Sequence, residues 1–291
     1  MTTAELLKKV RQVEIKTRGL VNHVFSGEYH SVFKGRGMEF SEVREYSYGD
    51  DIRQIDWNVT ARHGKPFVKI FEEERELTVM LIVDMSRSGQ FGSFEAMKNE
   101  IATELCAVLA FSAIRNNDKV GMILFTDKVE KFIPPKKGKP HILRLVRDLL
   151  AFEPERNGTN ISAVLEYLNS AIKKRSIAFV ISDFIDKEYE QALRIVSKRH
   201  DVIAVTLQDP RERELPKIGL IKFRDAETMQ ERWIDTSDIP LRRAFERYWK
   251  EHDERLNKAL LSTKVDRISI EVHKPYIQPL VNFFRMREAR L

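Results

Sequence analysis

The sequence predicts an α/β fold, a doubly wound and mostly parallel sheet flanked by helices, with a β-rich or irregular N-terminal extension. Residues 77–83 are seven consecutive apolar or β-branched residues, and an aspartate follows them. Unbroken runs of this kind are typical of strands buried on both faces of a parallel sheet. From this run to about residue 207, strand-like and helix-like segments alternate along the chain, which indicates βαβ units.

The N-terminal part differs in character from the rest of the chain. Residues 1–75 are interpreted as an extension and residues 76–291 as the sheet domain. Apolar residues at helical spacing predict an amphipathic helix over 2–18, which either packs on the protein or lies on a membrane surface. Residues 19–70 mix glycine, aromatic and charged residues and suggest short strands between turns. Trp57 is expected in the core of this lobe.

The sheet domain is expected to contain strands and helices in regular alternation. The predicted elements are a strand at 77–84, a helix at 94–115, a strand at 119–126, an antiparallel edge strand from 129, helices at 139–152 and 161–173, a strand at 177–182, a helix at 187–199 and a strand at 202–207. Pro134 and Pro135 are expected to end the edge strand, because proline cannot donate to a sheet ladder.

Residues 209–238 break the alternation. Two short strand-like pieces, joined at about 227–230, predict a hairpin insertion. A long helix at 240–262, a strand at 268–272 and a C-terminal helix at 276–288 are expected to complete the domain.

Composition excludes several classes of protein. The chain has 291 residues, and its 50 basic residues are interleaved with 44 acidic ones, which argues against a nucleic-acid partner. Its one cysteine, Cys106, allows no internal disulfide and fits a reducing compartment. No apolar stretch is long enough to cross a bilayer, and the N-terminus lacks a signal-peptide core, so we expect a cytoplasmic protein.

Polar residues follow several of the predicted strands. Asp84, Ser86 and Ser88 end the first strand, Asp183 ends a later one, and Thr159 lies between two helices. In a doubly wound sheet these junctions share one edge. Two carboxylates and three hydroxyls, without histidine or cysteine, favour Mg²⁺ or Mn²⁺ over Zn²⁺. For residues 77–88 alone, an ordinary polar turn stays an equal alternative.

Two resemblances follow from these motifs. DMSRS at 84–88, Thr159 in NGTN and Asp183 in ISDF resemble the metal-ion-dependent adhesion site (MIDAS) of von Willebrand factor A (VWA) domains. GRGMEF at 35–40 and GDDIRQIDW at 49–57 resemble the signature of the bacterial domain-of-unknown-function 58 (DUF58) family. Arg87 departs from the small residue that related sequences often have, and a bulky cation there predicts weaker Mg²⁺ binding.

The resemblance implies interaction rather than catalysis. It implies a non-enzymatic module in which an Asp or Glu of a protein partner fills an open metal position. The implied partner is a MoxR-type AAA+ ATPase, with this chain as its adaptor or chaperone-like companion. The alternative is a Mg²⁺-dependent phosphoester hydrolase that uses Asp84 and Asp183, although the sequence reveals no lysine placed to assist them.

A second group of acidic residues lies in the extension. Asp50, Asp51 and Asp56 are near one another in the sequence and suggest a metal cluster at first sight. Neighbouring arginines, among them Arg44 and Arg53, favour a structural role, because charges this close in sequence usually form pairs or remain solvated.

Overall fold

The computed structural model describes residues 3–21, 38–73, 76–87, 98–224 and 230–290. The chain forms two compact units, a small one of residues 33–77 and a larger one of residues 1–32 and 78–291. The sequence analysis divides the chain once, near residue 75, whereas the structure groups helix α1 (Thr3–Leu20) with the larger unit. An ion pair contributes to the packing of α1 on the larger unit, since Lys16 Nζ in α1 lies 2.7 Å from Glu104 Oε1.

The larger unit is built on a six-stranded sheet with the strand order β10-β7-β6-β3-β4-β5. All neighbouring strands are parallel except the pair β4–β5, so β5 is an antiparallel edge strand. The strands are β3 (Thr78–Asp84), β4 (Lys119–Phe125), β5 (Val129–Lys136), β6 (Ile177–Ser182), β7 (Asp201–Gln208) and β10 (Asp266–Glu271). The predicted fold class is therefore confirmed, with β3 buried at the centre of the sheet.

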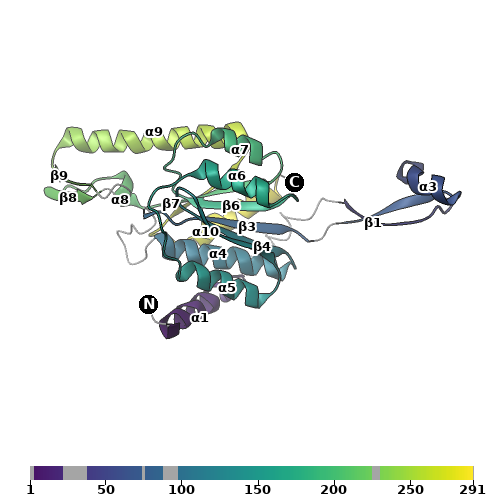
Figure 1. Ribbon diagram of the computed structural model, residues 1–291. Coiled ribbons are helices and arrows are strands. Elements are labelled where there is room, and N and C mark those ends of the chain that lie inside the picture. The colour runs from purple at the N-terminus through teal and green to yellow at the C-terminus, as the bar shows by residue number, and fades with distance from the viewer. Residues whose placement is uncertain (1–2, 22–37, 74–75, 88–97, 225–229, 291) are drawn as a thin grey trace. The chain divides into compact units, whose positions relative to one another are not determined.

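Helices cover both faces of this sheet (Figure 1). The helices are α4 (Lys98–Arg115), α5 (Lys139–Leu150), α6 (Ile161–Ala171), α7 (Glu190–Val196), α9 (Ile239–Thr263) and α10 (Ile277–Glu288). One core lies between the sheet and α6, α7 and the C-terminal half of α9, where Ile82, Leu165 and Leu256 are buried together. Helices α4 and α5 lie on the opposite face, with α1 packed against both. None of the described helices has the length and apolarity that a membrane span requires.

Most of the predicted elements occur within a few residues of their expected bounds. Strand β5 differs, because it continues through Pro134 and Pro135 to Lys136 instead of ending at the prolines. The pairing with β4 is irregular at these two residues, since Met122 pairs with Ile133 and Val120 with Lys136, and prolines are tolerated at such bulges on edge strands.

The small unit is a two-stranded antiparallel ribbon with two short helical turns. It contains β1 (Met38–Glu45), η2 (Ile52–Gln54), α3 (Trp57–His63) and β2 (Phe67–Glu73). The prediction that Trp57 lies in a core is wrong, because Trp57 is 67% exposed. Helix α3 has seven residues and none of them is buried, so this ribbon provides no interior for a large ring.

The predicted hairpin insertion is present in the larger unit. Strands β8 (Leu220–Arg224) and β9 (Glu231–Asp235) pair antiparallel. They follow the short helix α8 (Pro210–Arg213) and precede α9. We call α8, β8, β9 and residues 239–251 of α9 the arm; the rest of α9 packs on the sheet.

Candidate metal-binding site

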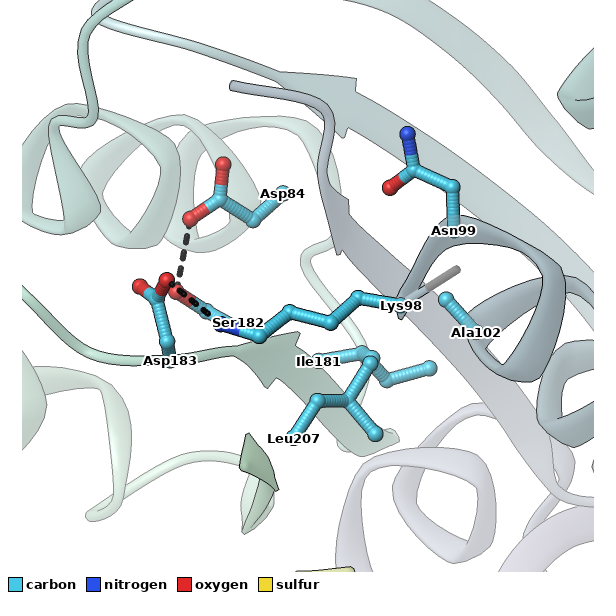
Figure 2. A pocket seen from close by; sticks show the side chains of 8 residues that line it. All are labelled: Asp84, Lys98, Asn99, Ala102, Ile181, Ser182, Asp183 and Leu207. Atoms are coloured by element: carbon cyan, nitrogen blue, oxygen red, sulfur yellow. Dashed lines mark hydrogen bonds and ion pairs between the residues drawn. The ribbon is translucent and has the colours of Figure 1, made fainter. Parts of the chain in front are cut away.

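The carboxyl edge of the central strands contains a small cavity (Figure 2). Its volume is about 20 Å³, and Asp84, Lys98, Ser182 and Asp183 line its polar side. Strand β3 lies between β4 and β6, and this places the last residue of β3 beside the last residue of β6. A space of this size holds about one water molecule.

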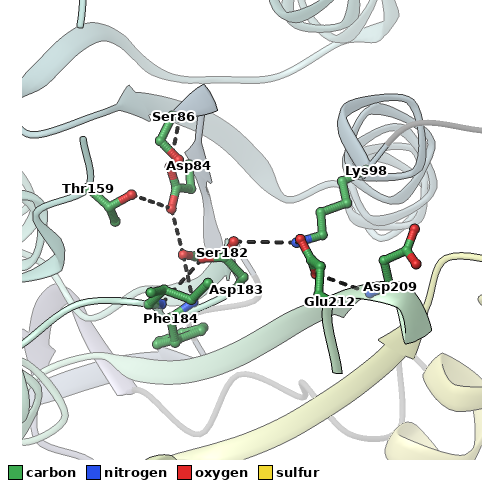
Figure 3. Close-up of polar contacts among 10 residues, drawn as sticks. Asp84, Ser86, Lys98, Thr159, Ser182, Asp183, Phe184, Asp209 and Glu212 are labelled. Atoms are coloured by element: carbon green, nitrogen blue, oxygen red, sulfur yellow. Dashed lines mark hydrogen bonds and ion pairs between the residues drawn. The ribbon is translucent and has the colours of Figure 1, made fainter. Parts of the chain in front are cut away.

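Asp84 is the centre of a set of hydrogen bonds (Figure 3). The Ser86 amide donates to Asp84 Oδ1 at 2.9 Å. The Ser182 hydroxyl donates to Asp84 Oδ2 at 2.6 Å, and the Thr159 hydroxyl approaches the same oxygen at 3.4 Å. The two hydroxyls come from different segments, so three parts of the chain meet at this carboxylate.

The loop before α6 places Thr159 at this edge. The backbone N–H of Asn160 donates to the backbone carbonyl of Thr126 at 2.9 Å, which fixes the loop to the end of β4. The Asn160 side chain accepts from the Ala163 amide at 2.9 Å and caps α6. Both contacts fix the residue that directly follows the threonine.

Asp183 lies next to Asp84 and brings a second negative charge. Its Oδ1 accepts from the Ile185 amide at 3.3 Å. Burial raises the pKa of Asp84 to about 7, and repulsion from the Asp183 carboxylate acts in the same direction. A pair of carboxylates in this state favours a divalent cation that neutralises both charges.

The structure brings four of the five predicted residues to one edge. Asp84, Ser86 and Thr159 are joined by hydrogen bonds, and Asp183 is their neighbour. The fifth, Ser88, lies outside the described residues. Among the described residues, no three His, Cys, Asp or Glu side chains gather as a metal-ligating group. A metal would therefore use two carboxylates together with hydroxyls and water, a donor set that suits Mg²⁺.

Three further residues, Ser182, Lys98 and Glu212, belong to this site and are not predicted from the sequence. Ser182 directly precedes Asp183, and its position at a strand end is a usable signal. Lys98, at the start of α4, is only 2% exposed, and its Nζ lies 2.6 Å from Glu212 Oε1 and 3.4 Å from Asp183 Oδ2. The sequence does not reveal this lysine beside Asp183, because no sequence pattern distinguishes a buried lysine from a surface one.

Glu212 reaches Lys98 from the arm. Helix α8 begins with a capping box. The Asp209 side chain accepts a hydrogen bond from the backbone amide of Glu212, and the Glu212 side chain accepts one from the backbone amide of Asp209. This fixes the Glu212 carboxylate beside the ammonium of Lys98. The buried cation offsets part of the negative charge of the edge, so Lys98 and a metal ion would both act on Asp183.

Comparison with known proteins gives a family and a fold. Residues 42–255 match the family described as "Protein of unknown function DUF58". An uncharacterized protein of Mycobacterium tuberculosis H37Rv is 27% identical over 286 residues, which cover 97% of this chain and 90% of that protein. Uncharacterized protein YeaD of Bacillus subtilis 168 is 26% identical over 109 residues, 38% of this chain and 25% of that protein.

Solved structures share the architecture of the larger unit. An aerotolerance-related membrane protein from Bacteroides fragilis, crystallised with multiple mutations to serines, matches with a TM-score of 0.51 and 17% identity. The match covers 74% of this chain and all of that one. The VWA domain of SpRpn10 matches with a TM-score of 0.42 and 12% identity, over 72% of this chain and 95% of that one. Together with the strand order above, the first of these matches shows an α/β fold with a mostly parallel sheet for the larger unit.

Proposed function

This chain belongs to the DUF58 family, whose function is unknown, and on that premise we propose that it is a non-enzymatic, metal-dependent protein-interaction module. The observation that supports this most strongly is the pair of neighbouring carboxylates, Asp84 and Asp183, at the carboxyl edge of a mostly parallel sheet. Ligands of open α/β sheets bind at this edge. Among the described residues, Lys98 is the one cation beside this pair, and it offsets only part of the negative charge of the two carboxylates.

The residues that would hold Mg²⁺ or Mn²⁺ are those predicted from the sequence. Asp84, Ser86 and Ser88 would act from the end of β3, and Thr159 and Asp183 would act directly or through water. When bound, the metal supplies a Lewis-acidic position that a carboxylate can occupy. The partner would contribute that carboxylate from an Asp or Glu side chain.

We assign the partner role to a MoxR-type AAA+ ATPase, because that class of ATPase is what the family resemblance implies. The chain would act as its adaptor or chaperone-like companion. The carboxylate that completes the metal site would come from the ATPase or from a protein on which both act.

A binding measurement with full-length protein tests this function. Calorimetric titration of the source organism's MoxR-type ATPase should give Mg²⁺-dependent binding that EDTA and Asp84→Ala both abolish. Asp127→Asn is a suitable control, since Asp127 lies after β4 and pairs with Arg156 at 3.3 Å, outside the proposed ligand set. Binding that is unchanged by both EDTA and Asp84→Ala would refute the proposed function.

The hydrolase alternative gains one observation from the structure, namely the lysine beside Asp183. Lys98 is buried and bonded to Glu212, which keeps its ammonium away from a substrate that approaches from solvent. Assays with phosphomonoester and phosphodiester substrates and Mg²⁺ separate the two functions. Turnover that Asp84→Asn abolishes would favour the enzyme, and absence of turnover in every assay would favour the interaction module.

A further inference from the structure

The arm contains a groove that the sheet does not fill. It lies between the β8–β9 hairpin and the first half of α9 and has a volume of about 420 Å³. Its lining includes Leu215, Phe223, Arg232, Ile234, Leu241 and Phe245. Most of these side chains are apolar. Phe223 is 40% exposed, so the groove leaves part of a phenylalanine ring in contact with solvent.

Strand alternation explains why the groove has this composition. Ile221 pairs with Ile234 and Phe223 pairs with Arg232, so these four side chains share the hairpin face toward α9. Trp233 points to the opposite face and is 66% exposed. Two strands of five residues are marginally stable alone, and a bound segment would add to the apolar surface that this face buries.

One charged side chain, Arg232, is among the residues that line this groove. Lys222 and Arg224, on the other face of the hairpin, both pair with Glu231. The Arg232 side chain makes no ion pair with any described residue, and its one side-chain hydrogen bond to a described residue is a 3.5 Å contact with Gln230 Oε1. Guanidinium groups of this kind favour carboxylates.

A row of rings connects the groove to the candidate metal site. Phe245 lies 6.4 Å from Trp249 between ring centroids, and Trp249 lies 5.5 Å from His252. Trp249 and His252 line a small pocket together with Asp183 and Glu212. Packed rings of α9 therefore lie between the groove and the edge where the two carboxylates meet.

We infer that this groove is a second recognition site, which binds an acidic peptide segment carrying a bulky apolar side chain. The apolar side chain would pack on Phe223 and Phe245, and a flanking carboxylate would pair with Arg232. This inference rests on the proposed function for the identity of the occupant, a segment of the same partner that supplies a carboxylate to the metal. It does not depend on the metal for the binding itself.

The test uses full-length protein and three synthetic 12-residue peptides with the same leucine- and phenylalanine-containing centre. Their flanks are glutamate, glutamine or lysine, and fluorescence anisotropy measures binding. The glutamate peptide should bind at least tenfold more tightly than the lysine peptide. Phe223→Ser should weaken it at least tenfold, and Arg232→Glu should reverse the preference. Trp233→Ser, on the opposite face of the same hairpin, should leave all three affinities unchanged.

Other outcomes overturn the inference. Equal affinity for all three peptides, or affinities that do not change in Phe223→Ser and Arg232→Glu, would show that the groove does not read this chemistry. A dimer in sedimentation velocity that Phe223→Ser dissociates would assign the groove to a second copy of this chain instead.

The same titration in EDTA, and with Asp84→Ala, separates this inference from the proposed function. Peptide binding that persists in both, while ATPase binding shows no Mg²⁺ dependence, would retain the groove and reject the metal-dependent module. Mg²⁺-dependent ATPase binding without any peptide preference would do the reverse.

Discussion

Two groups of aspartates in this protein have opposite electrostatic surroundings. In the small unit, Asp50 receives two hydrogen bonds of 2.7 Å from Arg44, and Asp56 caps α3 by accepting from the amides of Asn58 and Val59. These bonds lower the pKa of both carboxyl groups. At the sheet edge, burial and the neighbouring Asp183 raise the pKa of Asp84 to about 7.

The difference separates structural carboxylates from candidate functional ones. Asp50, Asp51 and Asp56 each accept a hydrogen bond from a backbone amide close in sequence, which helps to build a turn. Asp84 and Asp183 repel each other in a site with little solvent, and such an arrangement costs stability in the absence of a cation. A cluster of acidic residues therefore indicates a metal site only when nearby N–H and guanidinium groups do not already bind its carboxylates.

The largest expected effect on the free energy of unfolding comes from removing Lys98, the buried cation beside the two aspartates. Lys98→Met leaves Asp183 and Glu212 without their shared ammonium, and loss of one partner of a buried ion pair costs about 3–5 kcal/mol. Urea unfolding should show this loss in EDTA, with partial recovery in Mg²⁺. An unchanged unfolding midpoint in EDTA would mean that the lysine does not balance the two carboxylates.

The next effect has the opposite sign. Asp84→Asn should stabilise the protein in EDTA by on the order of 2–4 kcal/mol at pH 8, since it removes one of two repelling charges. The gain should disappear near pH 4. A carboxyl group whose pKa is raised on folding contributes its stability below its unfolded pKa and loses it as the pH rises through about 7.

Metal dependence provides the control for this variant. Mg²⁺ should raise the stability of the native sequence and leave Asp84→Asn unchanged. A variant that is less stable than the native protein in EDTA at pH 8 would contradict the repulsion between Asp84 and Asp183.

A third variant tests whether burial alone explains the contrast. Burial raises the pKa of Asp148 on α5, but hydrogen bonds from Arg147 and Lys131 outweigh it and lower the pKa overall. Asp148→Asn should therefore cost about 1–3 kcal/mol at pH 7. The cost should shrink as the pH falls through the lowered pKa, because a depressed carboxyl pKa gives stability only in the ionised form. Chemical denaturation between pH 3 and pH 7 measures this.

The smallest effect is expected in the small unit. Asp56→Ala removes the cap of α3 on an exposed surface, so it should loosen this turn and leave Mg²⁺-dependent stability unchanged. Amide hydrogen exchange of residues 57–63 should become faster. Faster exchange at residues 79–83 of β3 would show instead that the two regions are coupled.

Much of the larger unit is predictable from the sequence, because the spacing of its apolar residues reflects which faces of the strands and helices are buried. The apolar run before Asp84, the hairpin at 220–235 and the helix at 239–263 all have the expected type and place. Thr159 and Asp183 are predictable because strand ends in a doubly wound sheet share an edge.

The remainder depends on contacts between distant segments. Lys98 and Glu212 are 114 positions apart, and each looks like a surface residue in its own helix. Trp57 shows the converse failure, since its apolarity suggests a core residue, whereas it lies exposed on a helix without buried residues. The N-terminal helix is predicted as a helix, but its packing on α4 follows from complementary surfaces rather than from any local signal.

The placement of α1 has a consequence for how the chain can be rearranged. Residues 33–77 interrupt the larger unit between its first helix and its first strand, so this segment is an excursion that leaves one folded body and returns to it. The entropy of closing such a loop grows only slowly with its length. Replacing the excursion by a short glycine–serine connection should therefore leave the sheet and its first helix folded, and would yield a minimal version of the larger unit for crystallisation.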